Sequence, residues 1–200
     1  MSPSPAAKVC IACSIFRNEI ERLQAEARLD FPVRFLGSML HMVPEKLDQR
    51  LREVVAEERA KGQDIVLAYG DCCPNMAGIG TAEGVDRTQG FNCPEILLGK
   101  ETYRQLRREG VFFLLPEWTL MWRRVFQGTL GLLGGTAQDF MKEMHTRLVY
   151  LDTELVTIPE KELAEIAEYC GLPVERMKVS LEPLLASLLK AATRVPHEQA

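Results

Sequence analysis

The sequence contains no uninterrupted apolar run near the ~20 residues that a membrane-spanning helix needs. Its first residues, Met1-Ser2-Pro3-Ser4-Pro5, lack the basic start and the apolar segment of a secretory signal. We therefore expect a cytoplasmic protein with no membrane partner. Thiols stay reduced in the cytoplasm, so the six cysteines predict catalytic, metal-binding or buried thiols rather than disulfides.

Concentrated positive charge is also missing. The formal net charge is -4, and lysines and arginines are mixed with acidic residues along the predicted helices. The densest basic run, Arg104 to Arg108, includes Gln105 and Leu106 and indicates a solvated helix face, so we expect no nucleic-acid partner. The glycines at 78–80 and 131–135 match neither GxGxxG nor a Walker motif, which argues against a phosphate-binding loop.

Short apolar runs alternate with stretches whose apolar residues recur at helical spacing. The runs Lys8–Phe16, Val33–Leu40 and Asp64–Gly70 predict buried strands that lie side by side and point the same way. Later runs predict further strands near Val111–Leu115 and Leu148–Leu151. Such alternation predicts an α/β fold with a mainly parallel sheet and helices on both faces. We expect a single domain over 1–200, made of a site-bearing half (8–99), a second βα half (100–192) and a frayed tail (193–200).

Four potential metal ligands are expected at one edge of this sheet. Cys13 lies near the end of the first apolar run, His41 follows the second, and Cys72 lies two residues beyond the third. Cys93 ends an irregular, glycine-rich segment that starts at the same edge. Ligands of open parallel sheets bind beyond the carboxyl ends of the strands, so the sequence predicts one site from these side chains.

The donor set favours a transition metal. Three thiolates and one imidazole are a common tetrahedral set for Zn(II), and an iron–sulfur cluster is the alternative cofactor. Mg(II) and Ca(II) prefer oxygen ligands and do not fit. The sequence contains no zinc-ribbon CxxC pair, because Cys10 and Cys13 are expected within one strand, on opposite faces.

The remaining candidates have weaker support. Asp71, Arg87, Arg17 and Glu19 could support the site from outside the ligand set or hold an anionic ligand, although each could equally be an ordinary surface or helix-end charge. Cys73 is a possible resolving thiol. The remaining cysteines and histidines, Cys10, Cys170, His145 and His197, are expected to pack or to lie outside the site.

Several motifs together resemble the family catalogued as domain of unknown function 1638. They are Ile11-Ala12-Cys13, Leu40-His41-Met42-Val43-Pro44, Tyr69-Gly70-Asp71-Cys72, Asn92-Cys93 with Leu97-Leu98-Gly99, Phe113-Leu114-Leu115-Pro116-Glu117-Trp118 and Val149-Tyr150-Leu151-Asp152-Thr153. The resemblance covers about residues 8 to 190. It implies a role near corrinoid-dependent methyl transfer, with a corrinoid protein or methyltransferase as partner, and reactive positions at Cys13, His41, Cys72 and Cys93.

Three functions remain open at this point. The first is a metal-binding protein in one-carbon metabolism, since a zinc-bound thiolate can accept a methyl group. If it is an enzyme, its chemistry would be that of a metal-thiolate methyltransferase. The second is a thiol redox protein that uses Cys72 with Cys73 or Cys93. The third is a docking module for a corrinoid protein in which the cysteines are incidental. The metal content of protein purified without oxygen distinguishes the first from the second.

Overall fold

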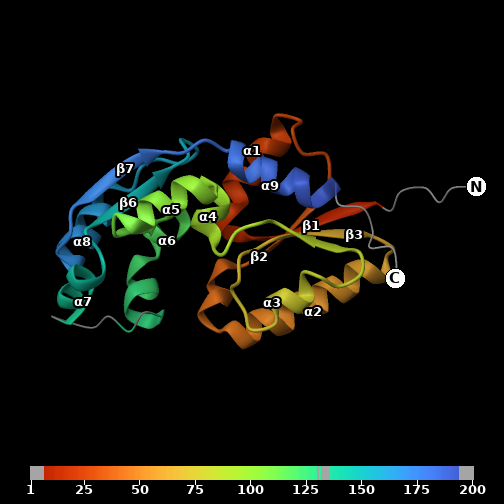
Figure 1. Cartoon of the computed structure of the whole chain (residues 1–200), viewed down its shortest axis with the longest axis horizontal. Helices are drawn as coiled ribbons and strands as arrows, with labels where there is room; N and C mark the ends of the chain where they lie inside the picture. Colours follow the sequence, from red (N-terminus) through yellow and green to blue (C-terminus); the bar gives the residue numbers. More distant parts are fainter. Residues whose placement is uncertain (1–6, 130, 132–135, 194–200) are drawn as a thin grey trace, which may run out of the picture. The chain divides into compact units, whose positions relative to one another are not determined.

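The computed structural model describes residues 7–129, 131 and 136–193 (Figure 1). These residues form two compact units, each with its own parallel sheet. The first unit comprises the described residues up to Ile96 together with those from Glu182 onward, and the second runs from Leu97 to Leu181. The α/β class and the parallel pairing are confirmed, whereas the strands lie in two sheets rather than in one. The predicted frayed tail falls, from residue 194, outside the described residues.

The first sheet has the strand order β2-β1-β3-β4. Its strands are β1 (Lys8–Cys13), β2 (Val33–Leu36), β3 (Asp64–Ala68) and β4 (Val85–Arg87). The parallel neighbours β1, β2 and β3 are those predicted from the sequence. Strand β1 is buried from Val9 to Cys13, which explains why its sequence is apolar on both faces.

Helices cover both faces of this sheet (Figure 1). Helix α2 packs on β1 and β3, and helix α9 packs on β3 and β4. The helical segments of this unit are η1 (Ser14–Phe16), α1 (Arg17–Ala25), η2 (Ser38–Met42), α2 (Pro44–Ala60), α3 (Met76–Ile79), α4 (Cys93–Leu98, which runs into the second unit) and α9 (Glu182–Thr193). Leu47, Leu51 and Val54 form the buried stripe of α2, at the helical spacing that its sequence shows.

The predicted strands are longer than the observed ones. Strand β1 ends at Cys13 and β2 ends at Leu36, and each is followed by a short 3-10 helix rather than by more strand. The backbone N–H of Ser38 donates to Oγ of Ser14 at 2.8 Å, so the two 3-10 turns are tied to each other. Ile15 and Phe16 are buried in η1, which is why the pattern of β1 appeared to continue. In η2 only Ser38 is buried, and the apolar Met39 and Leu40 are partly exposed.

The second sheet has the order β5-β6-β7. Its strands are β5 (Val111–Leu114), β6 (Arg147–Asp152) and β7 (Val174–Lys178). The helices of this unit are α5 (Lys100–Arg108), α6 (Pro116–Leu120), the π-helix η3 (Arg124–Thr129), α7 (Thr136–Met144) and α8 (Glu160–Cys170). Gly171 ends α8 with a positive φ of 62°, as expected of a glycine after a helix. No helix of the described residues is long and apolar enough to cross a membrane.

Candidate metal centre

Two neighbouring strands bring Cys13 and Cys72 to one edge of the first sheet. Strands β1 and β3 are parallel, with Ala12 opposite Ala68 in the register. Cys13 is the last residue of β1 and is only 6% exposed. Cys72 follows β3 after Tyr69, Gly70 and Asp71, and it is half-buried. Because parallel strands end at the same edge, both thiols lie at the edge where such sheets bind ligands.

A close backbone contact joins the Cys72 segment to the Cys93 segment. A Cβ at Gly70 would lie 2.6 Å from Cα of Asn92 and 2.6 Å from the carbonyl oxygen of Phe91. The N–H of Asp71 donates to this same carbonyl at 2.8 Å. Only glycine permits this approach, so residue 70 sets the separation between the segments that carry the two cysteines.

Cys93 is held at the first turn of helix α4. The N–H of Glu95 donates to Oδ1 of Asn92 at 3.0 Å, and Oε2 of Glu95 accepts the N–H of Phe91 at 2.8 Å. These reciprocal bonds are close in form to a capping box, in which two free backbone donors at a helix start are satisfied. The start of α4, and with it Cys93, is therefore fixed by its own flanking residues.

A series of pairwise contacts links the four predicted ligand residues. The Cys93 side chain hydrogen-bonds with Cys13 and with Cys72, and Cys72 also hydrogen-bonds with His41. His41 lies on the 3-10 helix η2, which follows β2. We call these four residues the Cys3His cluster. Among the described residues, no group of three or more Cys, His, Asp or Glu side chains is placed so that it could hold a metal ion.

The contacts in the cluster shift the pKa values of Cys72 and Cys93 in opposite directions. The pKa of Cys72 is lowered to about 5, first by the hydrogen bond from Cys93 and then by the hydrogen bond and charge of His41. The pKa of Cys93 is raised well above its ordinary value by its bonds to Cys13 and Cys72 and by burial. Cys72 is thus the preferred thiolate, and Cys93 is a thiol that donates to it.

Tyr69 is a neighbour of the cluster for which no role was predicted. The residue is 1% exposed, and its hydroxyl has no hydrogen-bond partner among the described residues. Burial raises its pKa well above the usual value, and charge on Cys13, Cys93 and Cys72 adds to this effect. The available signal was its position directly after β3, one residue beyond the last register pair with β1.

The predicted supporting residues lie apart from the ligand set. Arg87, on β4, forms an ion pair with Asp71 and so links the end of β3 to β4. Arg17 pairs with Glu21 at 3.3 Å, and its guanidinium lies 4.2 Å from the centre of the Phe35 ring. Glu19 is buried in α1 at 3% exposure. Asp71 and Arg87 therefore brace the site, while Arg17 packs on the surface of β2.

The other cysteines point elsewhere. The Cys73 thiol hydrogen-bonds with Asp48 of α2, and burial, followed by the charge of Asp48, raises its pKa to about 11. Cys10 and Cys170 are fully buried, and burial raises the pKa of each to about 12. His145 belongs to the second unit, where it packs against Phe112. His197 lies outside the described residues.

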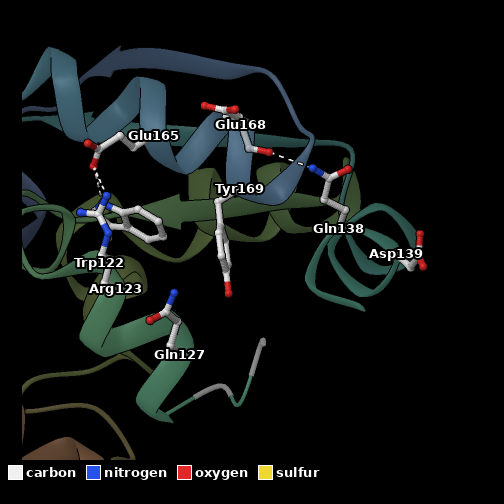
Figure 2. Close-up of a pocket in the computed structure, with 8 residues that line it drawn as sticks. All are labelled: Trp122, Arg123, Gln127, Gln138, Asp139, Glu165, Glu168 and Tyr169. Atoms are coloured by element: carbon white, nitrogen blue, oxygen red, sulfur yellow. Dashed lines mark hydrogen bonds and ion pairs between the residues drawn. The ribbon is translucent and has the colours of Figure 1, made fainter. Parts of the chain in front are cut away.

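The second unit contains a groove of about 650 Å³ that is separate from this chemistry. Figure 2 shows the residues that line it: Trp122, Arg123, Gln127, Gln138, Asp139, Glu165, Glu168 and Tyr169. Nε1 of Trp122 donates to Glu165 at 3.2 Å, and Arg123 pairs with the same carboxylate at 2.9 Å. These described lining residues include no thiol and no imidazole, so the groove offers none of the predicted ligands.

Comparison with known proteins gives a family for the chain. No curated protein and no solved structure matches it. The sequence profile of one family, described as "Protein of unknown function (DUF1638)", matches residues 35–188. This range includes three of the four cluster residues, His41, Cys72 and Cys93, whereas Cys13 precedes it. The match spans most of the sequence, and the chain therefore belongs to the DUF1638 family.

Proposed function

We propose that the Cys3His cluster binds one Zn(II) ion. The observation that carries this proposal is the chain of contacts from Cys13 through Cys93 and Cys72 to His41. Each of the four comes from a different segment, and their only common property is the position at this edge of the sheet. Buried thiols that merely pack do not require an imidazole at the end of such a series. Thiolate and imidazole donors suit Zn(II).

Direct contacts between thiols suit a single ion better than an iron–sulfur cluster. Tetrahedral zinc with Zn–S bonds of about 2.3 Å holds its ligand atoms roughly 3–4 Å apart. Thiolates around an iron–sulfur cluster lie farther apart, at about 6 Å, because inorganic sulfide fills the centre. In the Cys3His cluster, Cys93 hydrogen-bonds with Cys13 and Cys72, and Cys72 hydrogen-bonds with His41.

We further propose that the site acts in corrinoid-linked transfer of methyl groups. A zinc ion lowers the pKa of a bound thiol and keeps the thiolate available as a nucleophile. Four protein ligands would close the coordination sphere, so the chemistry needs one of them to give way to a substrate thiol. His41 is suited to this, because it lies at the end of the contact series and on the short helix η2. The three cysteines would then hold the site while the incoming thiolate receives the methyl group.

The decisive experiment is purification without oxygen, followed by elemental analysis and an absorption spectrum. We expect one equivalent of zinc and no visible absorption in the wild-type protein, and substantial loss of zinc in Cys72→Ala. Cys170→Ala is the matched control, because Cys170 is a buried thiol of the other unit, and it should retain the metal. A brown protein with iron and inorganic sulfide would contradict the zinc assignment, and wild-type protein without metal would overturn the metal site altogether.

The methyl-transfer step has its own test. Zinc-loaded protein, methylcobalamin and a small thiol are incubated without oxygen. Thiolate sulfur forms a bond to the methyl carbon while the cobalt–carbon bond breaks and leaves its electron pair on cobalt, so thioether and cob(I)alamin should appear in equal amounts. We expect the protein to accelerate this reaction and Cys72→Ala to abolish the acceleration. Equal rates with and without the wild-type protein would refute the proposed role.

A second function is favoured by the same thiol contacts. Cys93 touches both Cys13 and Cys72, so either pair could form a disulfide in a thiol redox protein. Cys73 is less suited as the resolving thiol, because it bonds to Asp48 instead. Mass spectrometry of metal-free protein in a graded series of glutathione buffers measures this activity. A reversible loss of two hydrogens between these cysteines, in protein that purifies without metal, would favour the redox function over the zinc site.

A further inference from the structure

The side chain of Tyr69 is placed toward the Cys3His cluster by the geometry of the sheet. Ala12 and Ala68 are the last register pair of the neighbouring strands β1 and β3. If the register is continued by one residue, Cys13 comes opposite Tyr69. Side chains at paired positions of adjacent parallel strands point to the same face of the sheet and lie about 5 Å apart at their origins. Tyr69 and Cys13 therefore share one face at the edge where the cluster forms.

The Tyr69 hydroxyl is costly to the protein in its present arrangement. The residue is 1% exposed, and the hydroxyl has no hydrogen-bond partner among the described residues. A buried polar group without a partner normally destabilises a folded protein, and phenylalanine would fill the same space without that cost. Unpaired buried groups of this kind call for an explanation, and one explanation is a partner that becomes available in another state of the site.

The strand register identifies that partner. Cys13 is the residue opposite Tyr69 when the pairing of β1 with β3 is continued beyond Ala12 and Ala68. A hydroxyl that keeps its proton can only improve its energy here by donating to an acceptor, and a thiolate is a far better acceptor than a thiol. In the arrangement described above, Cys13 and Cys93 are occupied with each other. Deprotonation of Cys13 by metal binding would turn its sulfur into the missing acceptor.

We propose that Tyr69 is a positioning residue whose hydroxyl donates a hydrogen bond to the Cys13 thiolate when the cluster holds its metal. This inference rests on the proposed metal site. The bond orients the Cys13 sulfur toward the ion and withdraws electron density from it. Cys13 then remains a fixed ligand, and the nucleophilic role is left to the incoming substrate thiolate. Groups that hydrogen-bond to metal ligands typically change metal affinity by ~10–100-fold when they are removed.

The test compares Tyr69→Phe with Tyr150→Phe in the full chain. Tyr150 is a second fully buried tyrosine, on β6 of the other unit, so its variant also loses one buried hydroxyl. Zn(II) affinity is measured by competition with a chromophoric chelator, and the absorption of the Co(II)-loaded protein reports on the sulfur ligands. We expect Tyr69→Phe to weaken Zn(II) binding by ~10–100-fold. We also expect it to move the sulfur-to-cobalt absorption to lower energy, because the sulfur becomes richer in electrons.

The stability of the metal-free protein is the second measurement, and it should not fall as the metal affinity does. Removal of an unpaired buried hydroxyl should leave the metal-free Tyr69→Phe protein as stable as the wild type or more stable. Weaker metal binding together with unchanged metal-free stability cannot come from general damage to the fold. Wild-type affinity and an unshifted cobalt spectrum in Tyr69→Phe would overturn the inference while leaving the metal site intact. Failure of the wild-type protein to bind either metal would instead overturn the proposed function and this inference with it.

Discussion

The predicted ligand set is tested most directly by comparing two cysteines of the same strand. Cys10 and Cys13 both lie on β1, and both are buried, at 0% and 6% exposure. They are three residues apart and so face opposite sides of the sheet. Only Cys13 contacts Cys93. The variants Cys10→Ala and Cys13→Ala thus remove the same atom from the same strand, and they differ in whether the cluster loses a ligand.

The two variants should differ in their free energy of unfolding as well as in their metal content. Cys10→Ala should cost about 1 kcal/mol of unfolding free energy, as expected for trimming a small buried group, and should leave the zinc content unchanged. Zinc at a free concentration a thousand times its Kd stabilises the folded state by about 4 kcal/mol. Cys13→Ala should lose most of that stabilisation together with its metal.

Urea unfolding with and without a chelator, combined with elemental analysis, measures both quantities. The wild-type protein and Cys10→Ala should lose stability when the chelator is added. The stability of Cys13→Ala should hardly change. Stoichiometric loss of zinc in Cys10→Ala, or full retention in Cys13→Ala, would show that the assignment of faces on β1 is wrong and that the ligand set must be revised.

Three further outcomes are expected. Gly70→Ala should weaken metal binding and cost about 1–3 kcal/mol, because its Cβ would meet Asn92 at 2.6 Å. Gly78→Ala, where no atom lies within 4 Å of the new Cβ, should do neither in the same zinc titration and urea series. Glu95→Ala should cost about 1 kcal/mol in urea through loss of the bond that caps α4, and Glu95→Gln, which keeps an acceptor, should restore most of it. In metal-free protein, alkylation of Cys72 by iodoacetamide should rise as the pH increases through about 5 and then level off, since the thiolate forms above its pKa; a rate that climbs steadily to pH 9 would contradict the lowered pKa.

The sequence was informative wherever one strand face or both are buried. The segments that became β1, β2 and β3 were recognisable as apolar runs, and parallel pairing followed from the helices between them. Strand ends were less visible. The run from Val33 to Leu40 is apolar except for Arg34, Gly37 and Ser38, yet β2 ends at Leu36 and Ser38 to Met42 form η2. Burial by a 3-10 turn and burial by a strand select the same residue types, so composition alone cannot separate them.

The irregular segment was only partly predictable. Its cysteines and glycines indicated a functional loop, and the contact at Gly70 explains one of those glycines. Strand β4, Val85–Arg87, is three residues long and includes two charged side chains, so no periodicity marked it. Its parallel register with β3, Leu67 opposite Arg87, places that arginine where it pairs with Asp71. Such a pairing depends on contacts between distant parts of the chain, which local patterns do not encode.

The reasoning that selected the four predicted ligand residues also explains why a fifth residue, Tyr69, was missed. The rule that ligands gather beyond the carboxyl ends of parallel strands selects residues by position, and soft-metal chemistry then keeps only thiols and imidazoles. Tyr69 meets the positional half of that rule as well as Cys13 does, since it follows the register pair of Ala12 and Ala68. It fails the chemical half, because a phenol is not a usual zinc ligand. A group that acts on the ligands rather than on the ion becomes visible only once burial and hydrogen bonding are known, and for Tyr69 the informative fact is a buried hydroxyl without a partner among the described residues.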